Sequence, residues 1–159
     1  MIIFRYCMNK IIKENFNLEI IKLKKLDGYE NENYLITTKN KKYIFKKYPY
    51  SPELATVIKG ENEVLLFLSK NNKRFPNPIK TVDGKYVKIY KINGEKFICR
   101  MLSFLEGEML GSIKNTKEMF ESLGLFLAKM DQNLQSYNNN IIKSRIWHWD
   151  LCNLYKMLL

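Results

Sequence analysis

Lys46 and Glu61 are the residues whose types and spacing point most directly to chemistry. Residues 42–47 have the pattern of a short strand, and its alternation places Ile44 and Lys46 on the same face. A lysine among apolar neighbours on a strand either extends its charged end to water at an edge or is held inward by a partner. The identity of that partner decides between these two interpretations of Lys46.

Glu61 is the candidate partner because it interrupts the apolar face of a predicted helix. The sequence predicts a helix over residues 51–70, with Ser51 as its N-cap and Pro52 at its first position. Apolar residues recur at helical spacing along it, at Leu54, Val57, Ile58, Leu65 and Leu68. Glu61 lies on that stripe, and an acid buried there without a partner is costly. Lys46 is the nearest inward cation upstream, and a strand lysine held by a helix glutamate can bind phosphate oxygens.

Both residues also have ordinary structural interpretations. Lys46 can be an edge-strand lysine like its neighbour Lys47, and Glu61 can be a partly exposed helix residue. Glu63 is an alternative carboxylate partner for Lys46.

The elements that would position the pair follow in a regular order. A short helix is predicted over residues 9–16, then strands over 19–26, 33–38 and 42–47, then the helix that carries Glu61. Asp83–Gly84 and Asn93–Gly94 each predict a β-hairpin, and a last long helix is predicted over 115–137, where Asn115 and Glu118 suggest a capping box. The fold class is therefore α+β, with an antiparallel sheet of about five strands and one helix inserted after the third.

This order resembles the small lobe of a protein-kinase-like fold. Within that fold the chain is similar to the aminoglycoside phosphotransferase and choline-kinase-like family, and in particular to its hydroxylysine kinase type. The resembling segments are 26–34 (LDGYENENY), 43–46 (YIFK), 61–68 (ENEVLLFL), 76–78 (PNP), 100–107 (RMLSFLEG), 123–131 (LGLFLAKMD) and 149–151 (WDL). The resemblance implies ATP as the bound nucleotide, residues 1–103 as the small lobe, and residues 104–159 as the hinge, connector and start of an incomplete large lobe.

The resemblance also assigns roles to individual residues. Lys46 would bind the phosphates with Glu61 holding it in position, and Ile44 would face the adenine. The loop from Gly28 to Asn33 would cover the phosphates, although it has no G-x-G-x-x-G pattern and also fits an acidic surface turn. Ser103 and Leu105 would contribute hinge backbone groups to the adenine edge, unless this stretch is only a strand end.

The segment around His148 and Asp150 imitates the start of a kinase catalytic loop. In such a loop an asparagine follows the aspartate by five residues and binds magnesium, but Tyr155 stands at that position and Asn153 comes too early. We therefore predict that Trp147 and Trp149 are packing residues and that His148 has no catalytic role.

The resemblance places the catalytic aspartate and the metal-binding residues of the family beyond this segment. No catalytic residue or metal ligand is therefore assigned, and Mg²⁺ is expected only in a full-length relative. The chain is expected to be the nucleotide-binding, N-terminal portion of an ATP-dependent small-molecule kinase and to be inactive alone. The phosphate acceptor is unknown, and a protein partner that completes the large lobe is an open alternative.

Composition limits the remaining function classes. A net charge of +11 allows a basic nucleic-acid-binding protein, but the lysines are spread along the chain, so this is the weakest hypothesis. A non-catalytic remnant or regulatory protein-binding module is the stronger rival. The three cysteines have neither zinc-ligand nor disulfide spacing and predict free thiols. No apolar run is long enough to cross a membrane, and a cytoplasmic protein is expected.

Overall fold

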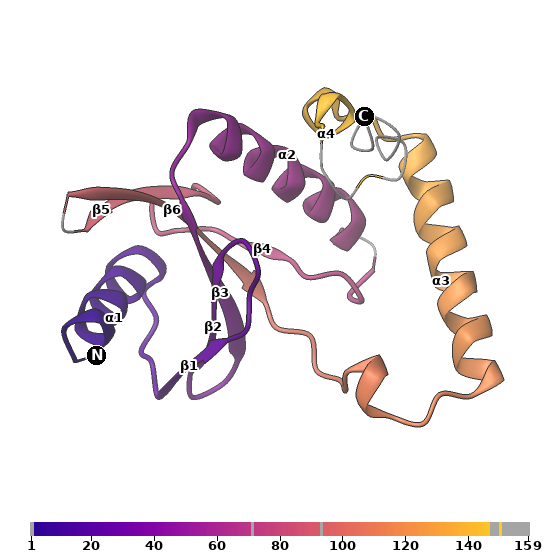
Figure 1. The fold of residues 1–159 in the computed structure, drawn as a ribbon, viewed down its shortest axis with the longest axis horizontal. Helices are drawn as coiled ribbons and strands as arrows, with labels where there is room; N and C mark the ends of the chain where they lie inside the picture. Colours follow the sequence, from indigo (N-terminus) through magenta and orange to yellow (C-terminus); the bar gives the residue numbers. More distant parts are fainter. Residues whose placement is uncertain (1, 71, 93, 147–149, 151–159) are drawn as a thin grey trace, which may run out of the picture.

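The structure is a computed structural model that describes residues 2–70, 72–92, 94–146 and 150. Along the described chain one helix precedes three strands, a second helix precedes three more strands, and two helices follow, as Figure 1 shows. The elements are α1 (Ile2–Phe16), β1 (Lys22–Leu26), β2 (Glu32–Thr37), β3 (Lys42–Pro49), α2 (Pro52–Ser69), β4 (Pro78–Ile79), β5 (Lys88–Ile92), β6 (Glu95–Ser103), a 3₁₀ turn (Leu110–Ser112), α3 (Lys117–Gln135) and α4 (Asn140–Ser144).

The six described strands form one antiparallel sheet in the order β1-β2-β3-β6-β4, with β5 also paired to β6. The predicted α+β class and antiparallel sheet are confirmed. The sheet has one strand more than the predicted five because β6 is long. β5 pairs with its first half, Ile92 opposite Glu95, and β4 pairs with its second half, Pro78 opposite Leu102.

Two helices cover opposite faces of this sheet (Figure 1). α1 packs Met8 and Ile12 on the face that carries Phe45, and all three are almost completely buried. α2 packs Ile58 on the other face, against Tyr48 and Ile98. Since side chains alternate along β3, Ile44 and Lys46 share the α2 face with Tyr48. The predicted grouping of Ile44 with Lys46 is therefore confirmed.

The start of α2 is as predicted. The Ser51 hydroxyl accepts a hydrogen bond from the backbone N–H of Leu54 at 3.0 Å, and Pro52 is the first helical residue. This cap uses a backbone donor that the helix cannot satisfy internally. Because the helix starts where expected, its register places Glu61 toward the sheet.

The two predicted hairpins have different outcomes. β5 and β6 form the hairpin around Gly94, whose φ of 88° suits a residue without a Cβ. The Asp83–Gly84 turn also forms, with Gly84 at φ 80° and the Thr81 N–H bonded to the Lys85 carbonyl. Its flanking strands do not pair with each other, so this hairpin prediction is wrong. Both strands pair instead with β6, which offers a longer edge.

Three predicted boundaries also need correction. α1 begins at Ile2 rather than at residue 9, and β1 begins at Lys22 rather than at residue 19. α3 begins at Lys117 because Thr116, not Asn115, caps it and accepts from the Met119 N–H at 3.3 Å. The Asn115–Glu118 capping box is therefore wrong. The predicted packing residues Trp147 and Trp149, together with His148, lie outside the described residues.

α3 differs from the other long helices because none of its residues is buried. Phe126 stacks on Phe75 with ring centroids 5.2 Å apart, and just after the helix Tyr137 stacks on Phe67 of α2 at 4.2 Å. The predicted apolar stripe is otherwise largely open, with Phe120 55% exposed and Leu127 43% exposed. α3 therefore lies beside the sheet domain (Figure 1) and adds little to its core.

Candidate nucleotide site

Lys46 lies at the centre of the sheet, between β2 and β6. Its Cα is opposite Asn33 on β2 and opposite Arg100 on β6. The ammonium is 6.0 Å from the centre of the Tyr48 ring. Burial lowers the pKa of Lys46, the positive charge of Arg100 lowers it further, and the charge of Glu61 opposes both.

Glu61 is near Lys46, but it is held by arginines. Its Oε2 accepts from Arg100 Nη2 at 2.6 Å, and its Oε1 lies 3.4 Å from Arg145 Nη1. No ion pair joins Lys46 to Glu61 within the described part of the chain, so the predicted direct pairing is not observed. The alternative carboxylate, Glu63, accepts a hydrogen bond from Asn139 at 3.0 Å.

Arg100 is the residue whose role the sequence did not reveal. It is only 4% exposed, and its guanidinium donates to Tyr48 Oη and to Asn62 Oδ1, each at 3.0 Å, as well as to Glu61. A buried arginine needs such partners because its charge cannot be removed at ordinary pH. The sequence carried one signal of this buried position: Arg100 alternates with Ile98 and Leu102 along an otherwise apolar strand.

The loop between β1 and β2 leads into the strand that pairs with β3, where Asn33 is opposite Lys46. A Cβ on Gly28 would lie 2.3 Å from the Asn31 carbonyl oxygen and 2.6 Å from Asn33 Nδ2, so the loop is closed too tightly for any side chain there. The Asn33 amide donates to the Asp27 carbonyl at 3.4 Å. Gly28 and Asn33 are thus brought next to the strand of Lys46.

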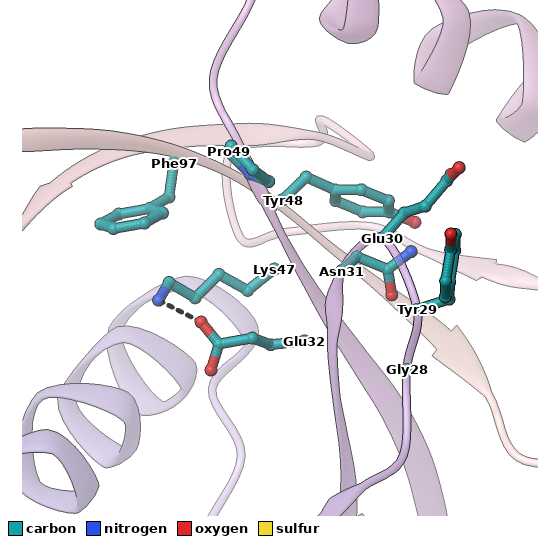
Figure 2. A pocket seen from close by; sticks show the side chains of 9 residues that line it. All are labelled: Gly28, Tyr29, Glu30, Asn31, Glu32, Lys47, Tyr48, Pro49 and Phe97. Carbon is teal, nitrogen blue, oxygen red and sulfur yellow. Dashed lines mark hydrogen bonds and ion pairs between the residues drawn. The ribbon is translucent and has the colours of Figure 1, made fainter.

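A cavity of about 270 Å³ lies under this loop (Figure 2). Its other wall comes from the end of β3 and from β6, with Tyr48 and Phe97 on opposite sides of β3. The lining residues are Gly28, Tyr29, Glu30, Asn31, Glu32, Lys47, Tyr48, Pro49 and Phe97.

Lys47 and Glu32 form a second ion pair, which no local sequence pattern indicates. Lys47 Nζ lies 2.6 Å from Glu32 Oε1 and 3.9 Å from the centre of the Phe97 ring, and Lys47 is 8% exposed (Figure 2). Burial alone would raise the pKa of Glu32, but hydrogen bonds from Lys47, Tyr34 and Lys25 and the charge of Lys47 together outweigh burial, so the pKa is lowered. Lys47 is therefore more buried than Lys46, and its bond to Glu32 anchors the base of the β1–β2 loop.

The predicted hinge begins at the end of β6. Ile44 is opposite Leu102 there. The Ser103 N–H donates to the Asn77 carbonyl at 2.9 Å, and the Ser103 hydroxyl accepts from the Asn77 N–H at 2.8 Å. Leu105 follows beyond the strand, with 43% of its surface exposed.

Asp150, at the far end of the described chain, extends the network of charged side chains formed by Arg100, Glu61 and Arg145. Arg145 Nη2 lies 3.9 Å from its carboxylate, while Arg145 Nη1 faces Glu61. Within the described residues, no group of three or more histidine, cysteine or acidic side chains is arranged to hold a metal ion. None of the described helices has the length and apolarity needed to cross a membrane.

The sheet, the inserted helix and the strand lysine define a protein-kinase-like fold. The family that matches is the phosphotransferase enzyme family (APH), whose model covers residues 22–141, and the chain belongs to it.

Relatives of known structure or name agree with this placement. The chain is 20% identical to the hydroxylysine kinase of Xenopus laevis over 91% of its own length and 42% of that protein. The amicoumacin kinase hAmiN, solved with AMP-PNP, Ca²⁺ and Ami, superposes with a TM-score of 0.70 at 21% identity, over 91% of this chain and 44% of that one. A microcompartment-associated aminopropanol kinase gives a TM-score of 0.68 at 16% identity, over 94% of this chain and 46% of that one. Spectinomycin phosphotransferase APH(9)-Ia, solved with ADP and spectinomycin, gives a TM-score of 0.65 at 14% identity, over 96% of this chain and 44% of that one. The chain therefore spans less than half the length of these relatives.

Proposed function

We propose that this chain is the nucleotide-binding, N-terminal part of an ATP-dependent small-molecule kinase. The observation that carries the proposal is Lys46, which lies on the α2 face of the sheet, opposite Asn33 of β2, with no carboxylate bonded to it among the described residues. A compact cation in that position can bind phosphate oxygens. Two neighbours of the same fold were solved with AMP-PNP and with ADP, which supports a nucleotide as the ligand.

The other groups extend this assignment along the sheet. The loop of residues 27–31 covers the phosphates, with Gly28 and Asn33 setting its shape. Ile44 faces the adenine. Of the two predicted hinge residues, Leu105 is the better donor of backbone groups to the adenine edge, because the Ser103 N–H is already bonded to Asn77. The boundary between small lobe and hinge falls after Ser103, where β6 ends.

We propose further that these 159 residues bind nucleotide without transferring phosphate on their own. Phosphoryl transfer needs a bound metal and an oriented acceptor hydroxyl. The described residues contain no cluster of three or more histidine, cysteine or acidic side chains that could hold the metal. Mg²⁺ and the acceptor belong to the large lobe. The neighbours are named for acceptors as different as hydroxylysine, spectinomycin and aminopropanol, so the acceptor is not assigned from them.

The test is ATP binding by the wild-type chain and by Lys46→Met, measured by calorimetry and by the thermal shift that ATP causes. Losing a hydrogen bond to a charged group removes about 1.5–3 kcal/mol, so we expect Lys46→Met to bind ATP roughly 10- to 100-fold more weakly. Lys91→Met is the matched control, because it removes the same charge from an exposed position on β5. Equal ATP binding by wild type and Lys46→Met would refute the role of Lys46.

One observation favours the rival function, a non-catalytic protein-binding module. α3 exposes Phe120, Leu123 and Leu127 to 55%, 40% and 43%, which is typical of a surface that another element or protein covers. Under this function the purified chain would show no ATP-induced thermal shift. It would form a stoichiometric complex with a protein partner, and Leu123→Asp would abolish that complex. A monomer that binds ATP equally well with and without Leu123→Asp would exclude it.

A further inference from the structure

A separate cavity lies between α2 and the segment that leads into β5. Its volume is about 430 Å³, and sites for small molecules usually measure about 300–1,000 Å³. One wall is a stripe of α2 that includes Ala55, Asn62 and Leu66, and the other includes Tyr86 and Val87. None of its lining residues lines the cavity under the β1–β2 loop or belongs to the candidate nucleotide residues.

Both walls of this α2 cavity are held by the fold. Ala55 and Val87 pack against the buried cluster around Ile58, which closes one end. Thr81, which is 4% exposed, fixes the wall opposite α2: its N–H donates to the Lys85 carbonyl at 2.7 Å, and its hydroxyl accepts from the Lys85 N–H at 3.1 Å. The cavity is therefore preformed, as small-molecule sites usually are.

Asn62 supplies a polar group that the described fold leaves unused. Its Oδ1 accepts a hydrogen bond from Arg100 Nη1 at 3.0 Å. Because a guanidinium only donates, the amide oxygen must face Arg100, and this fixes the position of Nδ2. Nδ2 is buried and has no hydrogen-bond partner among the described residues, and Asn62 as a whole is 3% exposed. A buried donor without an acceptor is costly, so a ligand oxygen at Nδ2 would remove that cost.

The charges around the cavity favour an anionic ligand. Lys59 and Lys85 line it, and both are exposed. Glu63 is the one acid in the lining, and it already accepts a hydrogen bond from Asn139 at 3.0 Å. Asp83, outside the lining, lies 3.7 Å from Lys85. Two cations against one carboxylate give the cavity a positive balance that attracts a negative group.

We propose that the α2 cavity binds a small carboxylic acid with an apolar body. The carboxylate accepts hydrogen bonds from Asn62 Nδ2, with Lys59 and Lys85 near enough to add attraction. The chain or ring of the acid lies along Ala55, Leu66 and Val87. This site does not depend on the proposed nucleotide function.

The test uses the full chain labelled with ¹⁵N and two acids, hexanoate and 3-phenylpropionate. Hexylamine and 3-phenylpropylamine are the matched controls, because they keep the apolar body and reverse the charge. In nuclear magnetic resonance titrations, each acid should shift the side-chain NH₂ signals of Asn62 and the backbone amides of Ala55, Leu66 and Val87. A dissociation constant of about 1 mM or below is expected for ligands of about ten non-hydrogen atoms. The amines should bind at least about tenfold more weakly.

Asn62→Asp tests the hydrogen bond to the carboxylate. The variant keeps an oxygen for Arg100 but replaces the NH₂ donor with a second oxygen, so both acids should bind roughly 10- to 100-fold more weakly. Lys59→Met removes an exposed charge and should weaken binding about two- to fivefold. Lys129→Met removes the same charge from α3, outside the cavity, and should leave binding unchanged.

Three results would overturn the site. The first is the absence of saturable shifts at Asn62 with both acids, and the second is equal binding of acids and amines. The third is displacement of the acids by ATP, which would place them in the nucleotide site. If wild type binds no ATP but the acids shift Asn62, the proposed function fails and the cavity stands. If Asn62→Asp does not fold, the wild-type shifts and the comparison with the amines still decide.

Discussion

Gly60 offers a stability test of how α4 packs on the sheet domain. A Cβ added at this buried glycine of α2 would lie 2.8 Å from Ile141 Cγ2, 3.0 Å from Ile141 Cβ and 3.2 Å from Ile142 Cδ1. The Gly60 carbonyl also accepts a hydrogen bond from Asn139 Nδ2 at 3.3 Å. The absence of a side chain is what allows α4 to approach this closely.

The magnitude follows from two opposing effects of Gly60→Ala. In a helix interior alanine is favoured over glycine by about 1 kcal/mol. Forcing an extra carbon into a packed contact costs about 1–3 kcal/mol, and the contact includes the branched Cβ of Ile141, which cannot rotate away. We therefore expect Gly60→Ala to lower the free energy of unfolding by up to about 2 kcal/mol.

Gly124 in α3 is the matched control for Gly60. No atom lies within 4 Å of a Cβ built there, so Gly124→Ala shows the helix preference alone and should stabilise the chain by up to about 1 kcal/mol. Urea unfolding followed by circular dichroism measures both variants, and their free energies should differ by about 1–3 kcal/mol. Equal stabilisation by the two substitutions would show that α4 does not pack on Gly60. Ile141→Ala in the Gly60→Ala background should recover part of the loss, because it removes the nearest methyl group.

Two further predictions concern Glu32 and Cys99. Glu32→Gln removes the ionic partner that Lys47 meets at 2.6 Å and should cost about 1–3 kcal/mol at pH 7. Because the pKa of Glu32 is lowered on folding, its contribution is complete above the unfolded value of 4.5 and is lost as the pH falls through the folded value, so urea unfolding between pH 5 and pH 3 should depend less on pH in the variant than in wild type. An unchanged pH dependence would contradict the assignment. Burial raises the pKa of the Cys99 thiol to about 12, so iodoacetamide at pH 8 should modify Cys99 at least about 100-fold more slowly in the folded chain than in urea, as measured by peptide mass spectrometry. Equal rates would place Cys99 outside the core.

Features that depend on neighbouring residues in the sequence were predictable. The Ser51–Pro52 helix start and the hairpin around Gly94 both formed as expected, because a cap or a tight turn is decided by a few adjacent residues. The face shared by Ile44 and Lys46 was predictable for the same reason. The Asp83–Gly84 turn formed too, but the sequence could not show that its flanking strands would pair with β6.

Lys46 and Glu61 show how far local sequence patterns determine the contacts of a charged residue. The position of Glu61 on an apolar helix face correctly implied that it needs a partner, and its register brought it near Lys46. The partner is nevertheless Arg100, which is 39 residues away in sequence and becomes adjacent only when β6 pairs with β3. No local pattern encodes that choice.

Hydrophobic periodicity and local caps and turns were enough to predict the order of the elements, the strand that carries Lys46 and the helix that carries Glu61. Which charges pair, Glu61 with Arg100 and Glu32 with Lys47, became apparent only in the folded chain. Such pairing depends on strand register and on which helix covers each face of the sheet, because these bring together residues that are distant in sequence. Those are properties of the whole packed fold, and they leave the Lys46 ammonium on the α2 face without a bonded carboxylate among the described residues.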